Sequence, residues 1–179
     1  MNTFKFVSDS KIPEKNTFIK NGVRFSVITE SLIRVEEQSS SVFCDMPTQS
    51  VVNRAFNCPE FSVSQSDGIV CIKTAKCEFY YSFGKKKMIK IILDDKRVVT
   101  DFKKGNLKGT CRTLDGTNGK TFLGDGIISR NGVAVLDDSN SLVLLQDGKI
   151  KKRKCKSKDI YYFAYSNRYK EAVSDFIDR

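Results

Sequence analysis

The sequence predicts an all-β protein, a large antiparallel β-sandwich followed by one C-terminal α-helix. Apolar and polar residues alternate in many short runs, which is typical of strands with one face in a core and one in water. Asn-Gly and Asp-Gly pairs, which tight hairpin turns prefer, separate many of these runs. Near the C-terminus the spacing of apolar residues changes to that of a helix.

The strand candidates follow one another at short intervals. Segment 77–83 alternates most clearly, because its odd-numbered residues, from Cys77 to Phe83, are all apolar or aromatic. In chain order the candidates are residues 23–29, 32–37, 61–66, 68–74, 77–83, 88–94, 132–137, 141–145 and 160–166. The predicted turns lie at 21–22, 67–68, 115–116, 118–119, 131–132 and 147–148. Such a series of short strands and turns favours a sandwich or a barrel.

The last segment, 167–179, predicts the helix. Its apolar residues share one face at helical spacing: Tyr169, Ala172, Val173, Phe176 and Ile177. We expect Ser166 or Asn167 to cap its first turn. A helix this short is marginal alone, so its apolar stripe should dock on another surface. The sequence thus divides into a sandwich domain, residues 1–166, and a terminal helix, residues 167–179.

The composition excludes several kinds of active site. The 179 residues include no His and no Trp, which removes the Ser-His-Asp triad, the Cys-His pair and the HExxH zinc motif. The six cysteines show no CxxC spacing, so structural zinc is not expected. We therefore expect no metal and no cofactor. Any chemistry would depend on Asp, Glu, Lys, Arg, Tyr or Cys.

The cysteines and the hydropathy indicate a reduced, cytoplasmic chain. No secretory signal is visible at the N-terminus, and no apolar run is long enough to span a membrane. In a chain of this kind the cysteines are expected to be buried small hydrophobic residues rather than disulfides. A membrane partner is therefore not expected.

Basic residues dominate one segment of a chain whose net charge is +10. Residues 149–158 hold seven basic residues in ten, which fits either a phosphate-binding patch or a solvated loop. No aromatic residue is interleaved there to stack on a base, so a basic nucleic-acid-binding β domain is the less favoured function. The chain also contains adjacent acidic residues, among them Asp137 and Asp138. The stretch that follows Asp137 favours a turn, and we expect the Asp138 side chain to hold that turn.

The stretch 106–139 is the most unusual in the chain. It is rich in Gly, Asp, Asn, Ser and Arg, and its first half has little periodicity, so it predicts a long loop on a strand scaffold. Loops of this kind commonly carry binding residues. Asp115 and Arg112 could bind sugar hydroxyls through charge-assisted hydrogen bonds, or could simply form a turn with a local salt bridge.

Four blocks of the sequence resemble a known family. NLKGTCRTLDG (106–116) followed by GIISRNGVAVLDDS (126–139) resembles the N-terminal β-sandwich domain of glycoside hydrolase family 31, which includes α-glucosidases and α-xylosidases. RFSVITESLIRVE (24–36) with VFCDMPTQSVVNRAF (42–56) is similar to the opening strands of that domain, and DIYYFAYSNRYKEAVSDF (159–176) to the element that leads into the catalytic barrel. The blocks keep the family's order over nearly the whole chain.

The resemblance implies a galactose-mutarotase-like sandwich in an enzyme that hydrolyses α-linked glucosides or oligosaccharides with retention. Such enzymes use two carboxylates about 5–5.5 Å apart. In the family both belong to a (β/α)8 barrel after the sandwich, so we expect no catalytic residue in this chain and no activity of the chain alone. By the same resemblance, Asp115 would reach the sugar pocket and orient the substrate. Arg112 is the weaker candidate.

The partner implied by the resemblance is the catalytic barrel of the same polypeptide. An apolar patch, including part of the terminal helix, should then be bare where the barrel docks. One departure is Val133, where bacterial relatives often carry Trp. A stand-alone carbohydrate-binding module is the alternative function, although a chain without Trp is poorly supplied with the aromatic platforms that such modules present to sugars.

Overall fold

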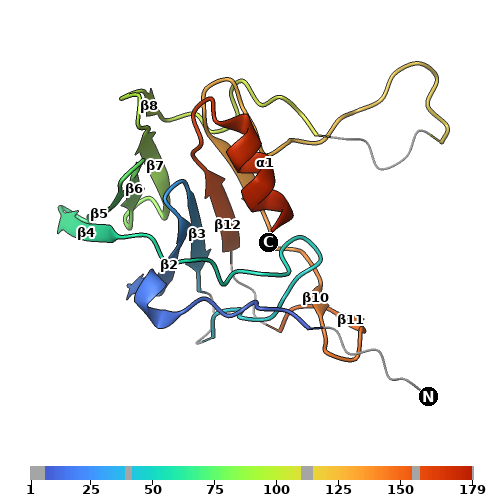
Figure 1. Cartoon of the computed structure of the whole chain (residues 1–179), viewed down its shortest axis with the longest axis horizontal. Helices are drawn as coiled ribbons and strands as arrows, with labels where there is room; N and C mark the ends of the chain where they lie inside the picture. Colours follow the sequence, from blue (N-terminus) through green and yellow to red (C-terminus); the bar gives the residue numbers. More distant parts are fainter. Residues whose placement is uncertain (1–6, 39–41, 110–114, 155–157, 179) are drawn as a thin grey trace.

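The computed structural model describes residues 7–38, 42–109, 115–154 and 158–178, which fold into two antiparallel sheets, a small hairpin and one helix. The two five-stranded sheets form the layers of a sandwich (Figure 1). The helix follows the last strand and lies against the first sheet (Figure 1). The prediction of an all-β sandwich with a C-terminal helix is confirmed.

The first sheet has the strand order β1-β2-β3-β12-β9, so the end of the chain returns beside its beginning. The second sheet is a meander, β4-β5-β6-β7-β8, and β10 pairs with β11 in a separate hairpin. The bounds are η1 (Glu14–Asn16), β1 (Thr17–Lys20), β2 (Val23–Thr29), β3 (Leu32–Glu37), β4 (Phe61–Ser66), β5 (Ile69–Thr74), β6 (Glu78–Ser82), β7 (Lys87–Ile92), β8 (Val98–Val99), β9 (Ala134–Asp137), β10 (Val143–Leu144), β11 (Ile150–Lys151), β12 (Lys158–Phe163) and α1 (Tyr169–Ile177).

Two predicted turns close the β1–β2 and β4–β5 hairpins. Asn21 and Gly22 have φ values of +49° and +72°, and Asp67 and Gly68 have the same pair of values. Two consecutive residues with positive φ give the turn twist that matches the twist of the flanking strands. The Asn-Gly and Asp-Gly pairs therefore set the register of both hairpins.

The main core lies between the two sheets. Phe25 of β2 meets Tyr81 of β6 there, with ring centroids 5.1 Å apart in an edge-to-face arrangement. A second apolar cluster covers the outer face of the first sheet, where Tyr161, Phe163 and Ala172 pack with loop residues. Because both faces of this sheet are covered, β2 and β3 are buried almost throughout rather than alternating.

The helix differs from its prediction at both ends. It spans Tyr169–Ile177, and its N-cap residue is Arg168, which makes no side-chain capping bond. The prediction that Ser166 or Asn167 caps it is therefore wrong. The Ser166 hydroxyl instead donates to Asp95 at 2.6 Å and accepts from Arg97 at 2.7 Å, which ties the residue before the helix to the second sheet.

Three short strands were not predicted. β8 and β11 have two residues each, too few to show an alternation, and β1 has four. β11 lies inside the basic segment 149–158, so part of that segment is a hairpin strand rather than a loop.

Of the described cysteines, Cys58, Cys71 and Cys77 are free thiols. Cys44 and Cys77 are buried, as predicted for small hydrophobic residues, whereas Cys58 and Cys71 are half-buried. Cys111 and Cys155 lie outside the described residues.

Candidate functional site

The loop that holds Asp115 projects from the sandwich (Figure 1). Residues 115–125 are all exposed, and the Phe122 side chain is 98% exposed. The base of the loop is held by a hydrogen bond of 2.7 Å from the Gly109 N–H to the Gly124 carbonyl. The Asn106 side chain also bonds both main-chain groups of Gly126 at 2.8 Å. A held base with an exposed tip is a geometry that can reach another surface.

Of the two predicted substrate-binding residues, the structure places one. Asp115 is exposed on the projecting loop. Arg112 lies outside the described residues. That Asp115 and Arg112 bind the same sugar therefore stays a prediction.

The terminal helix docks with one part of its apolar stripe and exposes the other. Ala172 is buried, and the Phe176 ring lies 6.4 Å from the Phe163 ring. Val173 and Ile177 are exposed, Ile177 by 72%. Polar contacts hold the helix in place: the Tyr165 hydroxyl donates to Asp175, Arg168 pairs with Asp94, and Lys76 pairs with Glu171.

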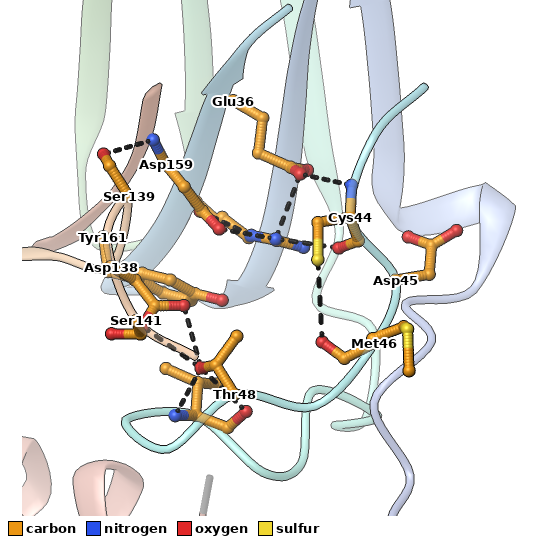
Figure 2. Close-up of polar contacts among 12 residues, drawn as sticks. Glu36, Cys44, Asp45, Met46, Thr48, Asp138, Ser139, Ser141, Asp159 and Tyr161 are labelled. Carbon is orange, nitrogen blue, oxygen red and sulfur yellow. Dashed lines mark hydrogen bonds and ion pairs between the residues drawn. The ribbon is translucent and has the colours of Figure 1, made fainter. Parts of the chain in front are cut away.

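A network of buried charges occupies part of the outer face of the first sheet (Figure 2). Its centre is Arg34 on β3, which donates to both carboxylate oxygens of Asp159 on β12, each at 2.8 Å. Arg34 also lies 3.0 Å from the Glu36 carboxylate. Because Glu36 and Asp159 face each other in the strand ladder, the guanidinium between them neutralises two opposed carboxylates.

Arg153 connects this centre to Asp138. It lies 2.7 Å from Asp159 and 2.6 Å from Asp138, and the Thr48 hydroxyl donates to Asp138 at 2.9 Å. The prediction that the Asp138 side chain holds a turn is wrong. Asp137 does so, accepting a 3.0 Å bond from the Ser139 N–H, because adjacent residues of the strand point to opposite faces and Asp138 points inward.

The network also holds the main chain of the segment Cys44 to Met46. The Cys44 carbonyl accepts from Arg34 at 2.9 Å, and its N–H donates to Glu36 at 3.0 Å (Figure 2). The Met46 carbonyl accepts from Arg54 at 2.9 Å. This segment is therefore fixed against the sheet by side chains rather than by strand pairing.

The surroundings of the network do not suit acid–base chemistry. Burial by itself would raise the pKa of Asp159, but the Arg34 and Arg153 guanidinium groups outweigh it, and the pKa of Asp159 lies below its usual value. Asp138 and Asp159 share Arg153, yet both are fully buried, so no substrate reaches them. The network was not predicted from the sequence. Its one local signal in the sequence is the pair Arg34 and Glu36, which lie on one face of a strand.

Metal binding and membrane crossing are two further functions to consider. Across the described residues, no group of three or more Cys, Asp or Glu side chains is placed to hold a metal ion. No helix in the same part of the chain is long and apolar enough to cross a bilayer.

The sequence matches no protein-family model and no curated protein. Among solved structures the chain is similar to the glycoside hydrolase family 31 dextranase of Flavobacterium johnsoniae, solved with glucose and, as a variant, with isomaltotriose. Both comparisons give a TM-score of 0.50 and 11% identity over 97% of this chain. A family 31 α-xylosidase of Xanthomonas citri gives a TM-score of 0.39 and 13% identity over 86% of this chain.

The chain spans 28% of the length of the dextranase and 23% of that of the α-xylosidase. At this identity the likeness to the dextranase shows the fold, a β-sandwich with a C-terminal helix.

Proposed function

We propose that this chain is a non-catalytic domain of a retaining α-glycosidase. It packs against a catalytic barrel of the same polypeptide and contributes a loop to the sugar pocket. Two independent observations support this: the four sequence blocks that resemble the N-terminal domain of glycoside hydrolase family 31, and the fold shared with a dextranase of that family.

The observation that carries the proposal is that the projecting loop and the terminal helix both expose large apolar side chains. The projecting loop returns to the sheet at Gly132, whose carbonyl accepts a 3.0 Å bond from the Ser166 N–H just before the helix. The loop and α1 therefore leave the sandwich from the same place. Phe122 on the loop and Ile177 on the helix are largely exposed, which is the chemistry of a surface that another domain covers.

In this arrangement Asp115 orients the substrate. An exposed carboxylate on a loop that reaches beyond its own domain can accept hydrogen bonds from sugar hydroxyls. Such contacts position the sugar and leave bond cleavage to the carboxylates of the barrel. Arg112, three residues earlier in the sequence, would support the same pocket.

The first test is to sequence the transcript beyond the codon for Arg179. We expect a continuation that encodes alternating strands and helices, and we expect the whole product to hydrolyse p-nitrophenyl α-glucoside with retention. The 179-residue chain, expressed alone, is the matched control and should be inactive. A stop codon directly after Arg179, or hydrolysis by the chain alone, would overturn the proposal.

The active longer product also tests the role of Asp115. In the active product, Asp115→Asn should lower kcat/KM by about ten-fold or more, because each lost transition-state contact of about 1.4 kcal/mol is a factor of ten. Asp67→Asn, in an exposed turn of the second sheet, is the control and should leave kcat/KM unchanged. Equal activity of both variants would remove Asp115 from the sugar pocket.

A stand-alone carbohydrate-binding module remains the alternative. Calorimetric titration of the 179-residue chain with maltose and isomaltose separates the two functions. Binding at millimolar or lower concentration would favour the module, whereas an accessory domain should not bind either sugar without its barrel.

A further inference from the structure

A cavity of about 530 Å³ opens between the segment Cys44 to Met46 and the β10–β11 hairpin. Its volume lies within the range of small-molecule sites, about 300–1,000 Å³. Five of its eleven lining residues have large apolar side chains: Val42, Phe43, Met46, Val143 and Leu145. The cavity lies beside the buried network, since the Cys44 main chain and Arg153 belong to both.

Three lysines belong to the lining of this cavity. Lys151, Lys152 and Lys154 all line it and are exposed, and none of them forms an ion pair with the described residues. The other charged groups there are compensated. Arg153 is bound by Asp138 and Asp159, and Asp45 lies 2.7 Å from Arg24. The cavity thus combines an apolar interior with three uncompensated positive charges.

The buried network holds both walls in place. Arg34 and Glu36 bind the main chain of Cys44 on one side, and Arg153 anchors the segment that follows β11 on the other. Pre-organised walls reduce the entropy that binding would otherwise cost. The lysine stems can lie along the apolar rim while their ammonium groups face an anion at the mouth.

From this combination we infer that the cavity binds a small amphipathic anion, an aliphatic tail several carbons long that ends in a carboxylate, sulfate or phosphate group. The tail occupies the apolar interior, and the head group meets Lys151, Lys152 and Lys154. Nucleic acid is the less suitable ligand, because its phosphates would use the lysines and leave the apolar interior empty. The inference does not depend on the proposed function.

The probe is decanoate below its micelle concentration, titrated into the 179-residue chain by calorimetry and by amide chemical shifts. Decyltrimethylammonium has the same tail with the opposite charge, so decanoate should bind about ten-fold more tightly or better. Its affinity should also fall as NaCl rises. Equal binding of the two amphiphiles would overturn the inference, because it would show a surface that selects for apolarity alone.

Two variants locate the binding. The triple change Lys151→Gln, Lys152→Gln and Lys154→Gln should weaken decanoate binding about ten-fold, and Met46→Asp, at an exposed side chain, should weaken it by a similar factor. The matched control is the triple change Lys85→Gln, Lys86→Gln and Lys87→Gln, which removes the same charge from exposed positions at the β6–β7 connection and the start of β7. A control that weakens binding as much as the hairpin variant would overturn the inference.

Vesicles of phosphatidylglycerol and a short single-stranded oligonucleotide test the other anions. Thermal unfolding curves show that each variant is folded before its binding is compared. Binding of vesicles or oligonucleotide without binding of free decanoate would overturn the inference, because the basic hairpin would then recognise an extended anionic surface.

Discussion

Arg34 and Asp159 lie 125 positions apart in the sequence and form a bidentate ion pair, with two contacts of 2.8 Å, that is fully buried on the outer face of the first sheet. A buried pair of this kind is costly to break, because removing one partner leaves the other charged and desolvated. The pair therefore joins β3 near the start of the chain to β12 near its end, and Arg153 extends the link to the basic hairpin.

Replacing Asp159 tests this link. Asp159→Asn leaves Arg34 without its principal carboxylate, and we expect a loss of about 3–5 kcal/mol in the free energy of unfolding. Urea unfolding measures it. Asp67→Asn is the control, since Asn-Gly suits the same turn as Asp-Gly, and should change stability by less than about 0.5 kcal/mol. A small effect at Asp159 would mean that the pair is not formed.

Acid should weaken the fold through the same carboxylate. The pKa of Asp159 in the folded chain is below its usual value, so its contribution is fully present above the unfolded pKa, near about 4, and is lost as pH falls further. Arg97 lowers the pKa of the more exposed Asp95, which adds a smaller loss in the same direction. Unfolding free energies at about pH 7 and about pH 3 measure the loss. Asp159→Asn should reduce it, and an unchanged pH dependence in that variant would contradict the assignment.

Gly132 occupies a position that no other residue fits. Its φ is +89°, and an added Cβ would lie 2.7 Å from Leu93 Cδ1 and 2.8 Å from Ser166 Cα. Gly132→Ala should therefore lower the free energy of unfolding by about 3 kcal/mol, from backbone strain and overpacking together. Gly22→Ala separates the two causes, because Gly22 also has positive φ but has open space around it. Equal losses in both variants would show that packing at Gly132 is not tight.

The terminal helix should tolerate a charge on its exposed face. In the chain alone, Ile177→Asp is expected to change the free energy of unfolding by less than about 0.5 kcal/mol. Ala172→Asp, five residues earlier and buried, should cost several times more. In a polypeptide that carries the barrel, Ile177→Asp should lower the thermal midpoint, since it would bury a charge between the domains. An unchanged midpoint there would count against α1 as a docking surface.

The described thiols should differ in reactivity. Burial raises the pKa of Cys77 to about 12, and its thiol donates to the Ala164 carbonyl at 3.2 Å. At pH 8 this thiol is almost entirely protonated, so it should react with iodoacetamide far more slowly than Cys58 or Cys71. Peptide mapping by mass spectrometry gives the rate at each site. Rapid labelling of Cys77 in the folded chain would show that its surroundings open readily.

The strands and turns could be predicted because their signals are local. The runs that became β2 to β7, β9, β10 and β12 show strand patterns within a few residues, and Asn21-Gly22 and Asp67-Gly68 have the residue types that their φ values require. The failures were also local. Two-residue strands carry no period, and Asp138 could be told from Asp137 only by knowing which face of β9 is covered.

By itself, the sequence determined the class of fold, the order of most of its elements and the kinds of site that a chain without His and Trp can build. Tertiary structure alone decided that Arg34 meets Asp159, that Arg153 joins Asp138 to the same cluster, and that three lysines and five apolar side chains line one cavity. The physical reason is distance along the chain. Periodicity and turn preference arise between near neighbours, whereas ion pairs and cavities depend on which distant strands come together.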